Sequence, residues 1–254
     1  MTVRGRDSYS IQSVDHALDV LEALCEEGDD VRISHLSEKL GMNKTSVFRL
    51  LATFENRGYV EREKGSGKYR LGLSAYEIGQ KFLSRMSLLR KARPVMERLV
   101  RECNEAIYLV VRRDEEVLFL DLVDTLQQVK IVSLAGRRFP LTKVAAGQVI
   151  LAQSPGLLRS STAQEYAKAT ELASIRLKGY GSDCHALGEG VASLAVALNA
   201  PGGEIPGSLC LVGPEFRMSQ VRIENDLQPR LREAGEIISS KLGYLGLYLG
   251  RELV

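Results

Sequence analysis

The fold is decided by residues 34–72, which read SHLSEKLGMNKTSVFRLLATFENRGYVEREKGSGKYRLG. In the first part of this stretch, Leu36 and Leu40 share one helix face, and Gly41 is suited to end that helix because glycine adopts left-handed backbone angles without strain. Asn43 follows shortly after, and its side chain can accept a hydrogen bond from the free amides of a new helix. The pattern therefore predicts two helices joined by a tight turn.

The second helix has an apolar face and a polar, basic face. Apolar residues recur at positions i, i+3, i+4 and i+7, the spacing of one helix face: Val47, Leu50, Leu51 and Phe54. This arrangement turns five polar side chains outward or toward the helix edges: Lys44, Thr45, Ser46, Arg49 and Thr53.

A short hairpin follows the second helix. Gly58 ends the helix, and residues 59–62 and 68–71 then alternate at the period of a β-strand. Gly65-Ser66-Gly67 lies between them, and its glycines tolerate the positive φ that a tight turn requires. The hairpin is the wing of a winged helix-turn-helix.

An amphipathic helix precedes this motif, beginning at Ser13 and ending before Gly28. Cys25 lies on its apolar stripe, so we expect it to be buried in the core. With this third helix, the sequence predicts a winged helix-turn-helix domain over residues 10–72, after a flexible arm at residues 1–9.

Charge divides this domain into an acidic and a basic half. Residues 10–41 carry eight acidic and two cationic side chains, a net charge of −6, whereas residues 42–72 carry seven cationic and three acidic ones, a net charge of +4. A module with this asymmetry orients its basic half toward a polyanion. The whole chain, at +2, offers no such attraction.

The basic half predicts an interface with double-stranded DNA. The second helix can lie in a major groove, where its first turns reach base edges, while the wing holds phosphates. The residues expected at this interface are Asn43, Lys44, Thr45, Ser46, Arg49, Lys64 and Lys68. The alternative, a charged and merely solvated surface, explains the helix or the hairpin alone, but not the two in this order.

Composition sets limits on the remaining functions. The chain has 254 residues, 44% of them hydrophobic and 26% charged, and it contains no apolar run long enough to span a membrane. We therefore expect a cytoplasmic protein with no membrane partner. The four cysteines are scattered, without the paired spacing of a zinc site or a disulfide framework, so no metal or cofactor is expected.

A helical segment links the winged domain to the rest of the chain. Proline removes a helix hydrogen bond and suits a first turn, so we predict one helix over residues 73–93 and another starting at Pro94. The first has more apolar residues than a small neighbouring domain would cover. It is therefore interpreted as a linker that also packs on a second subunit.

The third region, residues 94–254, predicts an α+β sheet domain. Five segments have the character of strands: two within residues 106–123, then 129–132, 191–198 and 208–212. Helices are expected at residues 145–152, 164–178 and 218–242.

Several motifs resemble the IclR family of bacterial transcriptional regulators. The segments ISHLSEKLGMNKTSVFRLLATFENRGYVER and GKYRLG resemble that family's DNA-binding domain, and AGRRFPLTKVAAGQVILA, GYGSDCHALGEGVASLAVAL and GSLCLVGP resemble its effector domain. The resemblance implies a GAF-like mixed α/β sensor domain and binding of a pseudo-palindromic operator. It also implies a homodimer, often a dimer of dimers. Both signs of regulation occur in the family, and we expect a repressor.

The resemblance further implies a pocket for a small organic effector, frequently a carboxylic acid. Matched motif to motif, its residues are Ala145, Ala146, Gly147, Asp183, Val191, Ser193, Cys210 and Val212. Free amides at a helix start bind anions, which agrees with the first three. Many family members have Cys at position 193 and Ser at positions 210 and 212. This less polar pocket predicts an aromatic or longer-chain acid rather than a two-carbon acid.

An enzyme is the alternative from another class. A hydrolase or metal-dependent reaction would use Asp183, Cys184, His185 and Ser193, with the helix-turn-helix serving only protein contacts. Neighbouring residues on an extended loop point in different directions, which favours a surface or effector-gating loop instead. A redox role for Cys184 or Cys210 has no cation nearby in the sequence to support it.

Overall fold

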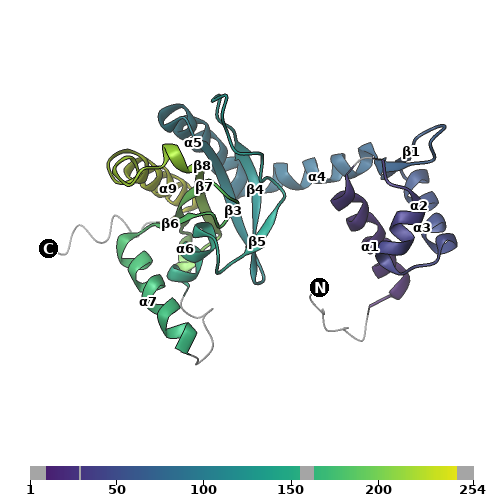
Figure 1. Cartoon of the computed structure of the whole chain (residues 1–254), viewed down its shortest axis with the longest axis horizontal. Helices are drawn as coiled ribbons and strands as arrows, with labels where there is room; N and C mark the ends of the chain where they lie inside the picture. The colour runs from purple at the N-terminus through teal and green to yellow at the C-terminus, as the bar shows by residue number, and fades with distance from the viewer. Residues whose placement is uncertain (1–9, 29, 155–162, 245–254) are drawn as a thin grey trace. The chain divides into compact units, whose positions relative to one another are not determined.

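The computed structural model describes residues 10–28, 30–154 and 163–244, and for residues 163–169 the backbone alone. The chain forms two compact units, residues 1–85 and 86–254. Figure 1 shows the elements of each unit, which are described separately below.

The first unit is a winged helix-turn-helix. Its helices are α1 (Gln12–Glu27), α2 (Ile33–Leu40), α3 (Lys44–Asn56) and α4 (Leu73–Arg85), and its wing is the antiparallel pair β1 (Val60–Arg62) and β2 (Tyr69–Leu71). Val20, Leu24, Leu36, Val47 and Leu51 form a fully buried core between the first three helices. The predicted helices, turn and hairpin are confirmed.

The wing is fixed to the body of this unit. Val31 pairs with Tyr69, each donating its amide to the carbonyl of the other at 2.9 and 2.7 Å, and the Tyr69 ring is buried. A side chain at Gly72 would bring a Cβ within 2.3 Å of the Gly58 carbonyl oxygen, so glycine is required where the wing returns. The hairpin base is therefore held in one position.

The prediction that Cys25 is a core residue is wrong. Cys25 is exposed, because the buried stripe of α1 is narrow and runs through Val20, Ala23 and Leu24. Burial of part of the thiol and the nearby Glu22 and Glu26 raise its pKa.

The predicted helix boundary at Pro94 is also wrong. Helix α4 ends at Arg85, Met86 has extended backbone angles, and α5 (Ser87–Cys103) continues through Pro94. Ala92 is fully buried before the proline, and Met96 and Leu99 are buried after it. Packing on both sides of Pro94 outweighs the one hydrogen bond that it removes.

The second unit is built on a six-stranded antiparallel sheet in the order β5-β4-β3-β8-β7-β6. The strands are β3 (Ala106–Arg113), β4 (Glu116–Val123), β5 (Arg138–Pro140), β6 (Gly181–Cys184), β7 (Val191–Leu198) and β8 (Gly207–Pro214). Four of the five predicted strands lie as expected. The exception is residues 129–132, where Val129 and Val132 are exposed and outside the sheet.

Helices cover both faces of this sheet (Figure 1). One face packs against α5 and α9 (Gln228–Leu242), and the other against α6 (Ala145–Gln153), on which α7 (Ala163–Lys178) lies. Before α9 come the short turns η2 (Pro201–Gly203) and η3 (Glu215–Arg217), helix α8 (Gln220–Arg222) and the π-helical turn η4 (Ile223–Leu227). The α+β prediction is confirmed. None of the helices in the described ranges combines the length and apolarity that crossing a bilayer requires.

Candidate nucleic-acid interface and effector site

The start of α3 has the geometry that the sequence predicts. Gly41 ends α2 in the left-handed conformation, and Asn43 Oδ1 accepts a hydrogen bond from the Ser46 amide at 2.8 Å. Asn43 is thus the cap of this helix. Lys44, Thr45 and Arg49 are exposed, and Ser46 is half-buried.

Four cations of α3 and the wing form no ion pair with an acidic side chain of the described residues. Among the residues that the structure describes, no ion pair involves Lys44, Arg49, Arg57 or Lys64. Other cations of the unit are paired; Lys39 Nζ, for example, lies 3.0 and 2.7 Å from the carboxylates of Glu26 and Glu27. Lys39 is therefore neutralised within the acidic half, whereas the α3 face leaves its cations available to a polyanion.

The two wing lysines that are predicted to contact DNA have different environments in the structure. Lys64 is exposed near the tip of the hairpin, whereas Lys68 Nζ is 3.1 Å from Asp30 Oδ2 and its side chain is largely covered. Lys68 has to leave this ion pair before it can hold a phosphate.

The second predicted site is brought together on the α6 face of the six-stranded sheet. Alternate residues of two adjacent strands point to this face: Val191 and Ser193 of β7, and Ser208, Cys210 and Val212 of β8. Asp183 of β6 pairs directly with Ser193, and Ala145, Ala146 and Gly147 are buried at the start of α6. All eight predicted effector residues thus lie on one face, although they come from four elements.

A carboxylate already occupies the start of α6. The Ala145 amide donates to Asp183 Oδ2 at 2.6 Å, and the Ser193 hydroxyl donates to the same oxygen at 2.7 Å. Burial raises the pKa of Asp183, and these two hydrogen bonds partly oppose that rise. The expectation that the Ala145 amide is free for an anionic ligand is therefore wrong.

Two of the predicted pocket residues, Ala146 and Gly147, have structural roles as well. A Cβ at Gly147 would lie 2.0 Å from the Leu141 carbonyl oxygen, so glycine is needed for close packing there. The Ser208 hydroxyl donates to the Ala146 carbonyl at 2.9 Å and ties α6 to β8. Cys210 is completely buried, and burial raises the pKa of its thiol.

The residues of the enzyme alternative do not form a catalytic arrangement. Asp183 and Ser193 are bonded to each other, but His185 points away, with Nδ1 accepting from the Gly190 amide and Nε2 3.4 Å from Glu215 Oε2. Burial and neighbouring carboxylates raise the pKa of the exposed Cys184 thiol, which disfavours the reactive thiolate.

Comparison with known proteins identifies the family. Residues 13–64 match the IclR helix-turn-helix domain, and residues 80–240 match the family described as bacterial transcriptional regulator IclR C-terminal. The chain belongs to the IclR family of DNA-binding transcriptional regulators. It is 30% identical over 249 residues to the HTH-type transcriptional regulator KdgR of Escherichia coli, covering 92% of this chain and 94% of that protein.

Other relatives of this IclR-family chain agree in fold. It is 25% identical to the transcriptional repressor IclR of Escherichia coli, over 84% of each chain. A regulator from Rhodococcus sp. RHA1 superposes with a TM-score of 0.79 at 20% identity, covering 92% of this chain and 99% of the other. An IclR homologue from Microbacterium hydrocarbonoxydans, solved in complex with 4-hydroxybenzoate, superposes with a TM-score of 0.73 at 22% identity. This match covers 89% of this chain and 98% of the other. These relatives are regulators, not enzymes.

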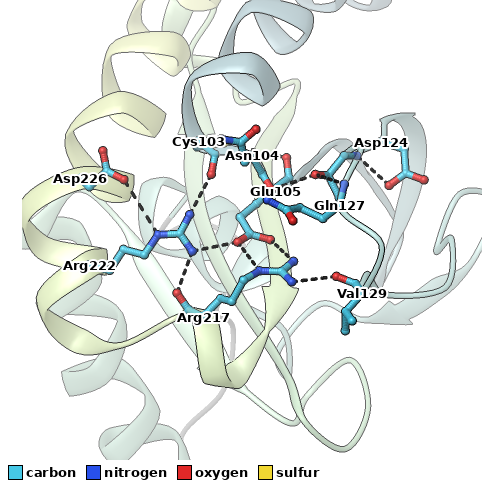
Figure 2. Close-up of polar contacts among 10 residues, drawn as sticks. Cys103, Asn104, Glu105, Asp124, Gln127, Val129, Arg217, Arg222 and Asp226 are labelled. Atoms are coloured by element: carbon cyan, nitrogen blue, oxygen red, sulfur yellow. Dashed lines mark hydrogen bonds and ion pairs between the residues drawn. The ribbon is translucent and has the colours of Figure 1, made fainter.

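A buried ionic cluster in the second unit of this IclR-family chain was missed by the sequence analysis (Figure 2). The Glu105 carboxylate, 1% exposed, accepts two hydrogen bonds from Arg217 and one from Arg222, all at 2.8 Å. Arg217 also donates to the Val129 carbonyl at 2.7 Å, and Arg222 to the Cys103 carbonyl at 2.8 Å. The cluster joins the end of α5, the segment at Val129, η3 and α8.

Sequence patterns could not reveal this cluster because its partners are distant along the chain. Glu105 is 112 residues from Arg217 and 117 from Arg222. The only local signal is Glu105 itself, an acidic residue directly before the apolar strand that begins at Ala106.

Proposed function

We propose that this regulator is a repressor that binds a pseudo-palindromic operator as a dimer or a dimer of dimers, and releases it in response to a small organic acid. The observation that carries the proposal is the α3 face, where Lys44 and Arg49 are exposed without an acidic partner among the described residues. Relatives named as repressors, including YiaJ and IclR of Escherichia coli, support the sign of regulation.

Self-association is supported by apolar side chains that the first unit leaves uncovered. Three lie on or next to α1 and four on α4, each at least half exposed: Ile11, Val14, Leu18, Leu73, Tyr76, Ile78 and Phe82. Isolated exposed apolar residues are ordinary, but seven on two helices of one small unit indicate a protein interface. A two-fold dimer would present two copies of α3 to two half-sites about one helical turn, ~34 Å, apart.

The effector is proposed to bind at the Asp183 and Ser193 region, on the α6 face of the sensor sheet. The neighbouring buried side chains are mostly apolar and include an aromatic group in which the Tyr108 and Phe119 ring centroids are 5.3 Å apart. Such surroundings favour a ligand with an apolar body. The 4-hydroxybenzoate bound to the Microbacterium homologue is of this class, which supports an aromatic acid here as well.

Regulation follows if the effector binds differently to two arrangements of the sensor domains. The α4 segment would then transmit the difference as a change in the spacing of the two α3 helices. A regulator that binds an operator has to meet the chromosome, so we place it in the cytoplasm.

Selection of duplexes from a random library by the full-length chain tests the first half of this proposal. We expect enrichment of two inverted half-sites, and lower transcription from a reporter promoter that overlaps them. Enrichment of a single, unpaired half-site would contradict the dimer, and increased transcription would contradict repression.

Calorimetric titration with a panel of acids tests the second half. We expect 4-hydroxybenzoate and other aromatic acids to bind more tightly than glyoxylate or acetate, and the tightest acid to weaken binding of the selected duplex. Preference for the shortest, most polar acids would contradict the proposed ligand class.

A further inference from the structure

One large apolar side chain stands on the DNA-facing side of α3 and is absent from the set of residues predicted to contact DNA. The Phe48 residue is 46% exposed, whereas its neighbour Val47 is fully buried. A single exposed phenylalanine needs no explanation on an ordinary surface. The exposure of Phe48 can be explained by its position on α3.

Phe48 belongs to a row that runs along the outward face of α3. Thr45, Phe48, Arg49 and Ala52 occupy positions i, i+3, i+4 and i+7, so they are neighbours on one face. Thr45 and Arg49 offer polar groups that can bond to base edges. Phe48 offers none, so any contact that it makes with a base has to be apolar.

The major groove presents one apolar group, the C5-methyl of thymine. We propose that Phe48 contacts a thymine methyl group next to the base that Arg49 reads, and so contributes to operator specificity. This inference rests on the DNA-binding role of α3. It assigns to that helix a contact that hydrogen-bonding residues cannot provide.

The charges around Phe48 favour a duplex over a protein as its partner. Lys44 lies one helical turn before Phe48 and Arg49 directly after it, and neither is ion-paired within the described ranges. An apolar protein surface seated on Phe48 would desolvate both cations without compensation. The phosphates that line a major groove would pair with them while the ring reaches the bases.

The test removes the methyl group from the DNA and the ring from the protein in a double-mutant cycle. A duplex selected by the full-length chain is synthesised with uracil in place of thymine, one position at a time. At one position per half-site, we expect the wild-type chain to lose about fourfold in affinity, the value for withdrawing one buried methyl group. Phe48→Ala should bind the thymine duplex more weakly and show no loss with uracil at that position.

Two further variants separate the contact from general effects. Phe48→Leu retains apolar surface and should keep part of the thymine preference. Phe216→Ala removes an exposed phenylalanine of the sensor unit and should keep all of it. The uracil series on the wild-type chain does not depend on the folding of any variant.

Each outcome decides a different statement. A wild-type chain that selects a duplex but is indifferent to uracil everywhere would overturn the role of Phe48 alone. So would a Phe48→Ala chain that keeps the full thymine preference, which is also the result expected if Phe48 contacts a protein. Failure of the full-length chain to select any duplex would overturn both the proposed operator binding and the proposed role of Phe48.

Discussion

Two pairs of cationic side chains, one pair in each unit, are used in opposite ways. In the second unit, Arg217 and Arg222 are bonded to the buried Glu105 carboxylate and to backbone carbonyls. In the helix-turn-helix unit, Lys44 and Arg49 are exposed and unpaired among the described residues. A bonded, buried charge holds segments of the fold together, whereas an exposed one is available to a partner. The environment of each cation therefore reports its function, which a net charge of +2 conceals.

The largest effect is expected where a charge is buried. Glu105→Ala should lower the free energy of unfolding by about 3 kcal/mol, because it leaves two partly covered guanidinium groups without their carboxylate. Urea denaturation measures this loss. The control is Glu97→Ala, which removes a carboxylate from a surface pair with Arg93 at 3.5 Å and should cost less than about 0.5 kcal/mol. Equal losses for the two variants would show that burial of the carboxylate does not determine the size of the effect.

The next largest effect concerns the exposed charge of Arg49. Its removal should change DNA recognition and leave the free energy of unfolding nearly unchanged. Arg49→Ala should reduce discrimination between operator and random DNA by about 1–3 kcal/mol, because a side chain that bonds to base edges is lost. Gel-shift titrations with both duplexes measure it. Arg57→Ala removes the same charge at the opposite end of α3 and should change discrimination much less. A comparable loss for Arg57→Ala would mean that charge alone, and not position, matters.

A third prediction concerns the carboxylate at the start of α6. The pKa of Asp183 is already raised by burial, and an acid bound beside it would raise that pKa further. Binding of an ionised acid should then take up a proton, so affinity should increase as pH falls from 8 toward the raised pKa, by at most about tenfold per pH unit. Calorimetry with the tightest acid of the panel measures this dependence.

Asp183→Asn is the control for this pH dependence. An amide does not titrate, so the variant should bind the same acid with a nearly constant affinity over this range. A wild-type affinity that does not vary with pH, or that increases with pH, would show that the acid binds away from Asp183.

The smallest effect should distinguish the two wing lysines. Lys64→Ala should weaken operator and random DNA about equally and reduce the slope of log affinity against log salt by about one. Lys68→Ala should change that slope less, because Lys68 is held by Asp30 at 3.1 Å. A salt series on both variants measures the difference, and identical slopes would show that the Lys68–Asp30 pair opens on DNA.

The parts of the fold that the sequence predicts well are those with local signals. Gly41 and Asn43 lie next to the helix ends that they determine, and the glycines of the wing lie within the turn that they allow. The long apolar strands β3, β4 and β7 were equally clear from their composition. In each case the residues that decide the structure are close together in the sequence.

The parts that it missed depend on distant contacts. Packing on both sides of Pro94 keeps α5 continuous, and Asp183 reaches the Ala145 amide from 38 residues away. The edge strands β5 and β6 are short and partly polar, so neither has the pattern of a strand. Phe48 lies in the sequence directly after the core residue Val47, and only its exposure in the structure distinguishes it.

The carboxylate of Asp183 has a consequence for the dose at which an acid would act. Because Asp183 already bonds to Ala145 and Ser193, an incoming acid competes with a group that is tethered beside the site and never diffuses away. The apparent affinity is the intrinsic one reduced by the fraction of molecules in which Asp183 has moved aside or gained a proton. Under the proposed mechanism, such an internal competitor would raise the concentration of acid at which half of the sites are occupied, so that a larger pool of metabolite is needed for the same response.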